Sequence, residues 1–131
     1  MLAKVQAYTI ARRLGTLAWA DTDAMAADPR LAEVATQLVR AIGSIAAQIA
    51  EGYSRRSRSD RIRYFEYALG STDEAISWYH TALPRLDTKL VESRLEDLVS
   101  IRRLLLVMIR NERAARTSSR SAPSSADNRR K

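Results

Sequence analysis

Apolar residues recur at helical spacing along most of the chain, and they are densest between residues 38 and 52. One helical face of this stretch carries four aliphatic side chains, Leu38, Ile42, Ile45 and Ile49. A second face is also mostly apolar, whereas a surface helix needs only one apolar stripe. We therefore expect this helix to be covered on most sides. Gly43 interrupts it at a cost of about 1 kcal/mol relative to alanine, which indicates that another backbone passes close by.

The same spacing predicts the first two helices. Residues 3–20 show one apolar seam, and an acidic, alanine-rich connection is expected at 21–28. The second helix opens at Asp28-Pro29, where the carboxylate can cap free N–H groups and the proline loses no hydrogen bond. It ends at Gly52, because glycine readily takes the left-handed conformation that closes a helix.

The third helix follows a short basic connection at 53–59. Ser57 or Ser59 can cap it, and its apolar residues alternate in steps of three and four up to Leu83. Pro84 then favours a helix end, since the residue before a proline is disfavoured in helical conformation.

The fourth helix is capped by Asp87 or Thr88 and should fray near Ala115. From Thr117 onward the chain is rich in serine and arginine and has too few apolar residues to fold. The sequence therefore predicts an all-α protein, an antiparallel up-and-down four-helix bundle over residues 1–116, followed by a disordered basic tail over 117–131.

Polar residues also fall at regular positions within the predicted helices. A thin polar line follows the second helix through Arg40, Ser44, Gln48 and Glu51. Arg40 and Glu74 are the charges that we expect to be buried, in an ion pair or network inside the bundle or between subunits. Two solvated charges at the rim of an interface are the alternative. Gly70 and Ser71 mark a second place where small residues allow close approach.

The positive charge is concentrated in two segments. The chain has 22 Lys and Arg against 15 Asp and Glu, a formal net charge of +7. Five arginines and one aspartate between residues 55 and 63 contribute +4, and the tail contributes the remaining +3. Concentrated positive charge favours nucleic acid as a partner, whereas a solvated loop or simple solubility is the alternative. The candidate nucleic-acid-binding residues are Arg55, Arg56, Arg58, Arg61, Arg63 and Tyr53, with Tyr64 on the other side of the connection.

Several function classes find no support in the sequence. Cysteine is absent, which excludes disulfides and thiolate chemistry, and no phosphate-binding glycine loop occurs. His80 is the single histidine, and Ser77 stands where a di-iron bundle would need glutamate, so we expect a structural or surface role for it. The longest apolar run is far shorter than the roughly 20 residues that span a bilayer. We expect a cytoplasmic protein with no enzymatic activity, cofactor, metal or membrane association.

A family resemblance rests on motifs that occur in order. They are Arg40-Ala41, Ser44-Ile45, Ile49-Ala50-Glu51-Gly52, Gly70-Ser71 and Glu74. With these motifs the chain resembles the four helix bundle protein family, also called the 23S rRNA intervening-sequence or S23 proteins, over residues 3–115. Gln48 departs from the asparagine usual in that family. The resemblance implies a ring-shaped homopentamer of four-helix bundles without established enzymatic activity.

Two functions of different classes follow. The first is an oligomeric bundle that binds RNA or DNA non-specifically through arginines. The second is a scaffold whose partner is another protein and whose basic patch only keeps it soluble. A related branch of the family, the accessory variability determinants of diversity-generating retroelements, consists of basic pentamers that assist a reverse transcriptase. A reverse transcriptase is therefore a further candidate partner.

Overall fold

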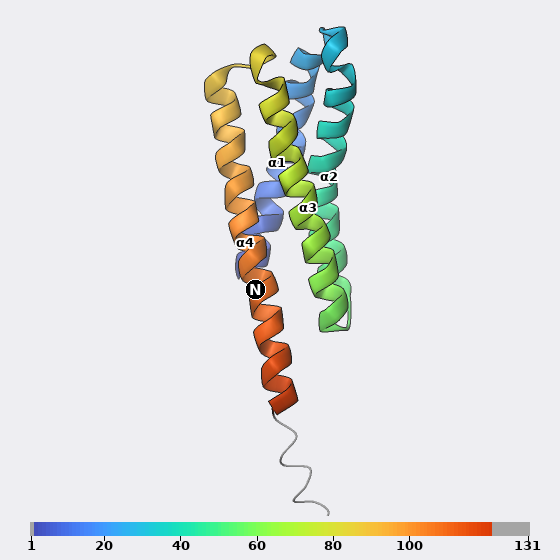
Figure 1. The fold of residues 1–131 in the computed structure, drawn as a ribbon, viewed down its shortest axis with the longest axis vertical. Helices are drawn as coiled ribbons and strands as arrows, with labels where there is room; N and C mark the ends of the chain where they lie inside the picture. The colour runs from blue at the N-terminus through green and yellow to red at the C-terminus, as the bar shows by residue number, and fades with distance from the viewer. Residues whose placement is uncertain (1, 122–131) are drawn as a thin grey trace, which may run out of the picture.

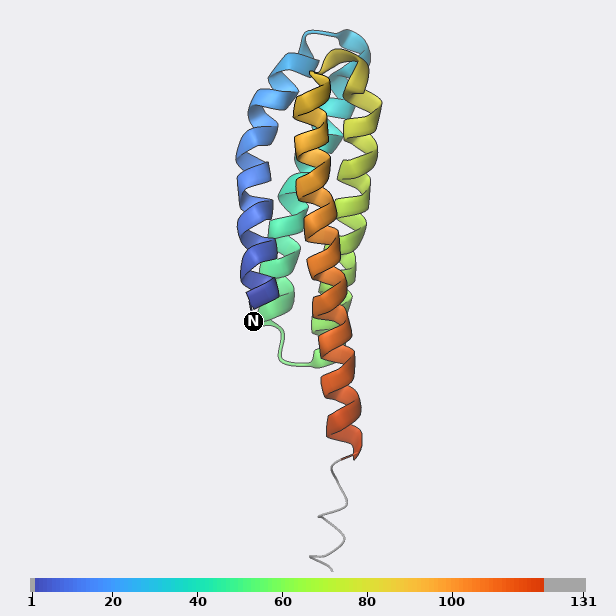
Figure 2. The same ribbon diagram turned by 90° about the vertical axis from the view of Figure 1, so that its left-hand side faces the viewer.

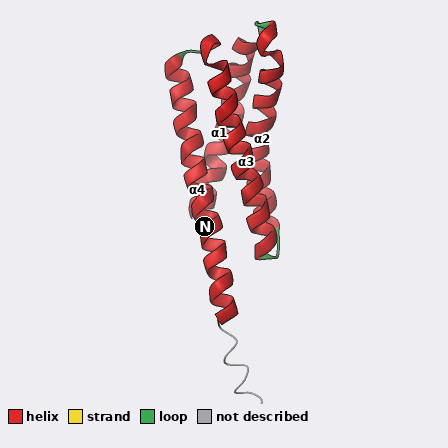
Figure 3. Cartoon of the chain, viewed as in Figure 1, coloured by secondary structure: helices red, strands yellow, loops and turns green. Residues whose placement is uncertain are grey.

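The computed structural model describes residues 2–121, and the side chains of residues 2–115. Four long helices make up nearly all of this part of the chain (Figure 1, Figure 3), namely α1 (Leu2–Ala26), α2 (Ala32–Ser54), α3 (Arg58–Ala82) and α4 (Thr88–Ser121). Two short 3-10 turns, η1 (Pro29–Leu31) and η2 (Leu83–Arg85), lie in the connections at one end. The described residues contain no strand.

Successive helices run in opposite directions and pack side by side (Figure 2). α1 packs on α2 and α4, and α3 packs on the same two helices, so each helix occupies one corner of the bundle. The predicted antiparallel up-and-down four-helix bundle is confirmed. No helix of the described chain is both long enough and apolar enough to cross a membrane.

The core consists of the residues that carry the helical spacing. In α2, Leu38, Ile45 and Ile49 are fully buried. The expectation that α2 is covered on most sides is wrong for the single chain, because Ala47 and Ala50 are exposed. Both alanines lie outside the core, and Ala50 lines a hollow together with Lys4 and Tyr8 of α1. Part of the apolar surface of α2 is therefore left uncovered in the single chain.

The first helix is longer than predicted. α1 continues through residues 21–26, which the sequence indicated as an acidic connection. The cause is a long-range partner: Arg94 on α4 donates from Nε to Asp21 Oδ2 at 2.8 Å and from Nη2 to Oδ1 at 3.2 Å. Tyr79 on α3 donates its hydroxyl to the same carboxylate at 2.6 Å. Asp21 therefore lies buried among three helices with its charge balanced.

The same network affects the protonation of Tyr79. Its ring is fully buried, and burial together with the hydrogen bond to Asp21 raises the pKa of the phenol well above its usual range. The phenol therefore stays protonated and serves as a donor. The network joins α1, α3 and α4 through polar contacts within an otherwise apolar core.

The connection before α2 contains a second ionic cluster. Asp28 accepts a hydrogen bond from the backbone N–H of Arg30 at 3.0 Å, so the predicted cap is present, although it caps η1 and α2 itself begins at Ala32. The guanidinium of Arg30 and that of Arg85 also donate to Asp28. These hydrogen bonds hold the pKa of the Asp28 carboxyl well below its usual range, the one from Arg30 most strongly.

The glycines behave differently from the prediction. Gly52 does not end α2, which continues to Ser54, and no glycine in the described chain has a positive φ. A Cβ at Gly52 would lie 2.8 Å from Tyr64 Cβ and 2.9 Å from Phe65 Cε1, so this is where α2 and α3 approach closely. Nothing lies within 4 Å of a Cβ built at Gly43 or Gly70, so the predicted close approaches there are wrong.

The last helix extends beyond the rest of the bundle (Figure 1). α4 continues to Ser121, past Ala115, where we expected fraying, and into the segment expected to be a tail. The remainder of the predicted tail, residues 122–131, lies outside the described residues. The α2–α3 connection lies at the same end of the bundle as the last turns of α4.

Candidate nucleic-acid interface

The basic connection is shorter than the sequence indicated. α2 ends at Ser54 and α3 begins at Arg58, so only residues 55–57 lie between the helices. Ser57 caps α3 by accepting the backbone N–H of Asp60 at 3.0 Å, which settles the choice between the two predicted serines. Arg55 has extended backbone angles and donates its own N–H to the Gly52 carbonyl at 3.1 Å.

Arg61 organises this end of the bundle. Its Nε and Nη2 donate to the two carboxylate oxygens of Glu112 on α4, at 3.0 and 3.2 Å. Its Nη1 donates to the carbonyl oxygens of Arg55 and Arg56, at 3.0 and 2.9 Å. A single guanidinium thus ties the connection, α3 and α4 together. These donors are already engaged within the chain. The structure therefore gives Arg61 a structural role in addition to the phosphate contact that the sequence predicted.

Arg55 and Arg58 are also engaged within the chain. Arg55 Nη2 donates to Glu51 and, at 2.9 Å, to the Tyr64 hydroxyl, and its guanidinium lies 4.7 Å from the centre of the Tyr64 ring. Arg58 Nη1 donates to the Ala115 carbonyl at 3.1 Å. Both guanidiniums remain more than a third exposed, so they keep a face toward solvent.

Arg56 and Arg63 are the most available of the five predicted arginines. The side chain of Arg56 is exposed and makes no ion pair or hydrogen bond within the part of the chain that the structure describes. Arg63 is also exposed and pairs only with Asp60 on its own helix, at 3.2 Å. Such exposed pairs are worth about 0–1 kcal/mol, so a phosphate can replace the carboxylate at little cost.

The aromatic residues are arranged otherwise than expected. Tyr53 faces α1, where Lys4 Nζ lies 3.1 Å from its ring centre, so that face of the ring is covered. On α3, Tyr64 and Tyr67 meet edge to face with ring centres 5.5 Å apart, and Tyr67 is 50% exposed. The structure brings Tyr67 next to the arginines, although the sequence analysis did not single it out. The available signal was its spacing, four residues after Arg63 and three after Tyr64, which puts the three side chains on one helical face.

α4 adds charges that the sequence analysis missed. Arg113 donates to Glu66 on α3 at 2.6 Å, and Arg110 is exposed without an ion pair in the described chain. Seven arginines against four carboxylates leave a local formal charge of +3; they are Arg55, Arg56, Arg58, Arg61, Arg63, Arg110 and Arg113, against Glu51, Asp60, Glu66 and Glu112. We call this set the basic end. Only the fold reveals it, because residues 110–113 lie about fifty positions away in sequence.

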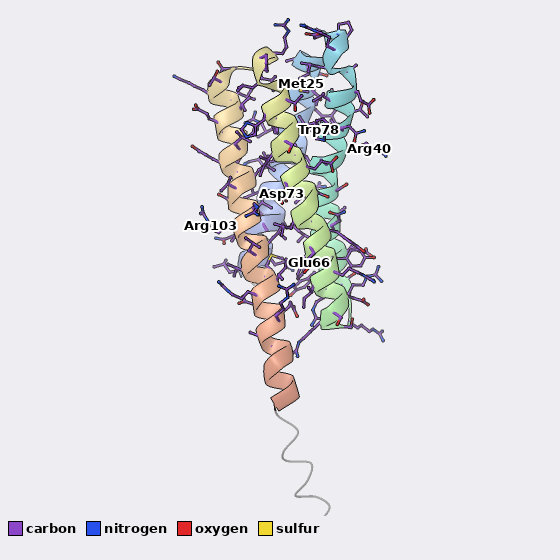
Figure 4. All side chains as sticks on the ribbon, viewed as in Figure 1. Met25, Arg40, Glu66, Asp73, Trp78 and Arg103 are labelled. Carbon is purple, nitrogen blue, oxygen red and sulfur yellow. The ribbon has the colours of Figure 1, made fainter. Side chains whose placement is uncertain are left out.

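The family-motif residues share the surface where α2 meets α3. Ser71 donates its hydroxyl to Gln48 Oε1 at 2.9 Å across the two helices. Trp78 Nε1 donates to Glu74 Oε1 at 3.2 Å. Arg40 projects from the outer side of α2 (Figure 4), and both it and Glu74 are exposed. The expectation that these two charges are buried is therefore wrong for the single chain, because no helix packs over this face.

The remaining polar residues of this face are only partly covered. Ser44 is half-buried, and Glu51 is exposed beside Arg55. His80 is exposed on α3. Within the described residues, no three histidine, aspartate or glutamate side chains gather in a way that could hold a metal ion.

Comparison with solved structures finds the same fold. A crystal structure of a protein of unknown function from the S23 ribosomal protein family of Bacteroides thetaiotaomicron matches with a TM-score of 0.76 and 20% sequence identity. The match covers 82% of this chain and 98% of that chain. No curated protein matches. The family described as 23S rRNA-intervening sequence protein matches residues 3–106, which include α1 except Leu2, all of α2 and α3, and residues 88–106 of α4. The chain belongs to this family.

Proposed function

We propose that this protein is a non-enzymatic, oligomeric bundle that binds RNA or DNA through its basic end. The observation that carries the proposal is the local excess of arginine, which comes from three places: the α2–α3 connection, the start of α3 and residues 110–113 of α4. Arginine neutralises phosphate and releases condensed counterions, and this term supplies most non-specific affinity.

The arginines of the basic end have two roles: some stabilise the fold, and others are exposed for contact with phosphate. Arg61 holds the connection in place through Glu112 and two backbone carbonyls. Arg56, Arg63 and Arg110 are exposed and make at most one ion pair each within the described chain. These three are the residues that contact phosphates. Tyr67, half exposed beside Arg63, supplies a ring on which an unpaired base can stack.

Assembly of several copies strengthens such a site. A ring repeats the basic end around its axis, so that one nucleic-acid strand meets several patches and gains affinity by avidity. The exposed alanines of α2 support self-association, because they leave an apolar helix face uncovered in the single chain. We propose that the ring contains five copies, as the family resemblance implies.

The test removes charge without touching the structural arginine. Replacing Arg56, Arg63 and Arg110 with glutamine should weaken binding to a single-stranded RNA at least tenfold and leave the melting temperature unchanged. The matched control replaces Arg30, Arg85 and Lys89, which lie at the opposite end of the bundle, and should retain wild-type affinity. Equal losses in the two variants would show that net charge alone is responsible and that the basic end is not the site.

The C-terminal segment is a separate source of charge. A chain that ends at Arg116 removes the serine-rich basic segment, and we expect it to keep most of the affinity. If truncation abolishes binding while the triple glutamine variant binds normally, the segment beyond Arg116 is the binding element and the proposed residues are not.

A protein partner is the alternative function. The ion pairs of Arg55, Arg58, Arg61 and Arg63 favour it, because they reduce the charge that the basic end presents to phosphate. Co-purification from native cells distinguishes the candidates. Bound nucleic acid supports the first function, a reverse transcriptase supports an accessory role, and another protein without nucleic acid supports a scaffold.

A further inference from the structure

We propose that the groove between α1 and α2 receives the outer face of α4 from a second copy of this chain. The inference rests on the oligomeric part of the proposed function and assigns its contact surface. It does not depend on nucleic-acid binding, because the main hollow of the groove lies on the side of the bundle, at Gly15 and Gly43, and none of the proposed phosphate-contacting arginines lines it.

The groove is open and flanked by an exposed tryptophan. Gly15 and Gly43 line a hollow of about 450 Å³ between the two helices, and Trp19 lies at its edge with 66% of its surface exposed. A second hollow of about 240 Å³, lined by Tyr8 and Tyr53, continues the groove toward the end of α2. A large exposed aromatic side chain beside an unfilled hollow is typical of a protein contact surface.

Two arginines make this side of the molecule positive. Arg12 lines the hollow, and Arg40 lies one helical turn before Gly43 on the outer side of α2 (Figure 4). Neither forms an ion pair with any residue that the structure describes. The first hollow is otherwise lined by Thr16, Trp19 and small or aliphatic residues, and Lys4 adds a third cation at the second hollow. A fitting partner therefore presents apolar side chains flanked by carboxylates.

The outer face of α4 has that composition. Val99 and Leu106 are 45% and 44% exposed. Glu92 and Glu96 precede them on the same side of the helix, and among the described residues neither has an ion-pair partner. Arg103 lies on this side as well, so two carboxylates against one arginine leave the face with a net charge of −1. Charge complementarity between the two surfaces of one chain therefore identifies the occupant as a second copy.

The two surfaces also match in height along the bundle. The Arg13–Asp97 ion pair, at 3.0 Å, places the middle of α4 level with the middle of α1. Gly15 and Gly43 line the same hollow, so the middle of α2 is level with both. Rotation about an axis parallel to the helices keeps these heights, so the groove of one copy can meet Glu92–Leu106 of the next. Contact between two different faces closes into a ring when the rotation between neighbouring copies divides a full turn.

Charge reversal tests the pairing by the mass of the assembly in solution. Arg12→Glu with Arg40→Glu should shift the protein from oligomer to monomer at micromolar concentration, as should Glu92→Arg with Glu96→Arg. All four changes in one chain should restore the oligomer, because the charges are again complementary. An oligomer in both double variants, or its absence in the quadruple variant, would overturn the assignment.

A pair of glycine variants tests the groove without changing charge. In Gly43→Leu the new side chain occupies the hollow without meeting other atoms of the same chain, so the bundle should stay folded. The association between copies should weaken at least tenfold, because the groove is filled. Gly70→Leu is the matched control, since its position is equally open but lies on another face. An oligomer in Gly43→Leu, or its loss only in Gly70→Leu, would place the contact elsewhere. A wild-type monomer would overturn the oligomeric proposal itself.

Discussion

At Gly52, α2 and α3 approach each other closely. An added Cβ would meet Tyr64 Cβ at 2.8 Å and the Phe65 ring at 2.9 Å, and neither neighbour can move freely within the packed helix pair. Gly70, by contrast, faces open space. The two glycines therefore differ in what they contribute, although both lie within helices.

Alanine at the two positions should have opposite effects. We expect Gly52→Ala to reduce the free energy of unfolding by about 1–3 kcal/mol through overpacking. Gly70→Ala should increase it by about 0.5–1 kcal/mol, because alanine favours the helix. Chemical denaturation of both variants measures these changes, and a stable Gly52→Ala protein would disprove the close approach.

Asp21 is a buried carboxylate, and Arg94 is the cation that balances its negative charge. Removing that partner leaves an uncompensated charge in the core, so we expect Arg94→Met to cost about 3–5 kcal/mol of stability. The control is Arg102→Met on the same helix, which breaks the exposed pair with Asp73 and should cost less than about 1 kcal/mol. Similar losses in the two variants would contradict the structural role of the Asp21 network.

The raised pKa of Tyr79 predicts how the free energy of unfolding changes at alkaline pH. Its folded-state pKa lies above the ordinary value of 10.0, so the unfolded chain releases this proton first as the pH rises. The stability that this difference provides is complete below pH 10 and is lost progressively above it. Denaturation at pH 8 to 11 should show a steeper alkaline loss in the wild type than in Tyr79→Phe. Identical pH profiles would be evidence against the raised pKa.

At the scale of helices, Arg61 connects elements that lie far apart in the sequence. It holds the α2–α3 connection to α4, so Arg61→Gln should lower stability by about 1–3 kcal/mol through lost charged hydrogen bonds. Arg56→Gln makes the same substitution in the exposed α2–α3 connection and should change the stability by less than about 0.5 kcal/mol. Thermal unfolding distinguishes the two, and equal effects would refute the division between structural and exposed arginines.

Local pattern was sufficient to predict the helices and their order. The steps of three and four that predict the third helix also identify its buried residues, including Phe65 and Tyr79. The end of α1 could not be predicted this way, because the partner of Asp21 lies more than seventy residues away. Local sequence indicated a connection, and tertiary pairing produced a helix.

The candidate site was predictable only in part. The five arginines around the α2–α3 connection stand out in sequence as a cluster of charge. Their division into structural and exposed members could not be predicted, because it depends on Glu112 and on backbone carbonyls. Arg40 and Glu74 were expected to be buried, since a single sequence does not show that no helix of the same chain covers that face.

At the scale of the whole molecule, the two ends of the bundle differ in charge. At the end that holds η1 and η2, Asp28 binds both Arg30 and Arg85 and reduces their effect. At the other end, arginines outnumber carboxylates by three in the described chain. A ring of such molecules gathers the basic ends on one side, which supports contact with a nucleic-acid strand.

The most direct test is the salt dependence of binding by the wild-type protein to a single-stranded RNA. With three phosphate contacts per chain, log affinity should fall linearly with log salt, with a slope of about −2 for each chain engaged. Fluorescence anisotropy between about 50 and 200 mM salt covers the range in which this loss is large. Salt-sensitive binding with this slope would support the account. Absence of salt-dependent binding to RNA and to DNA would contradict its central claim.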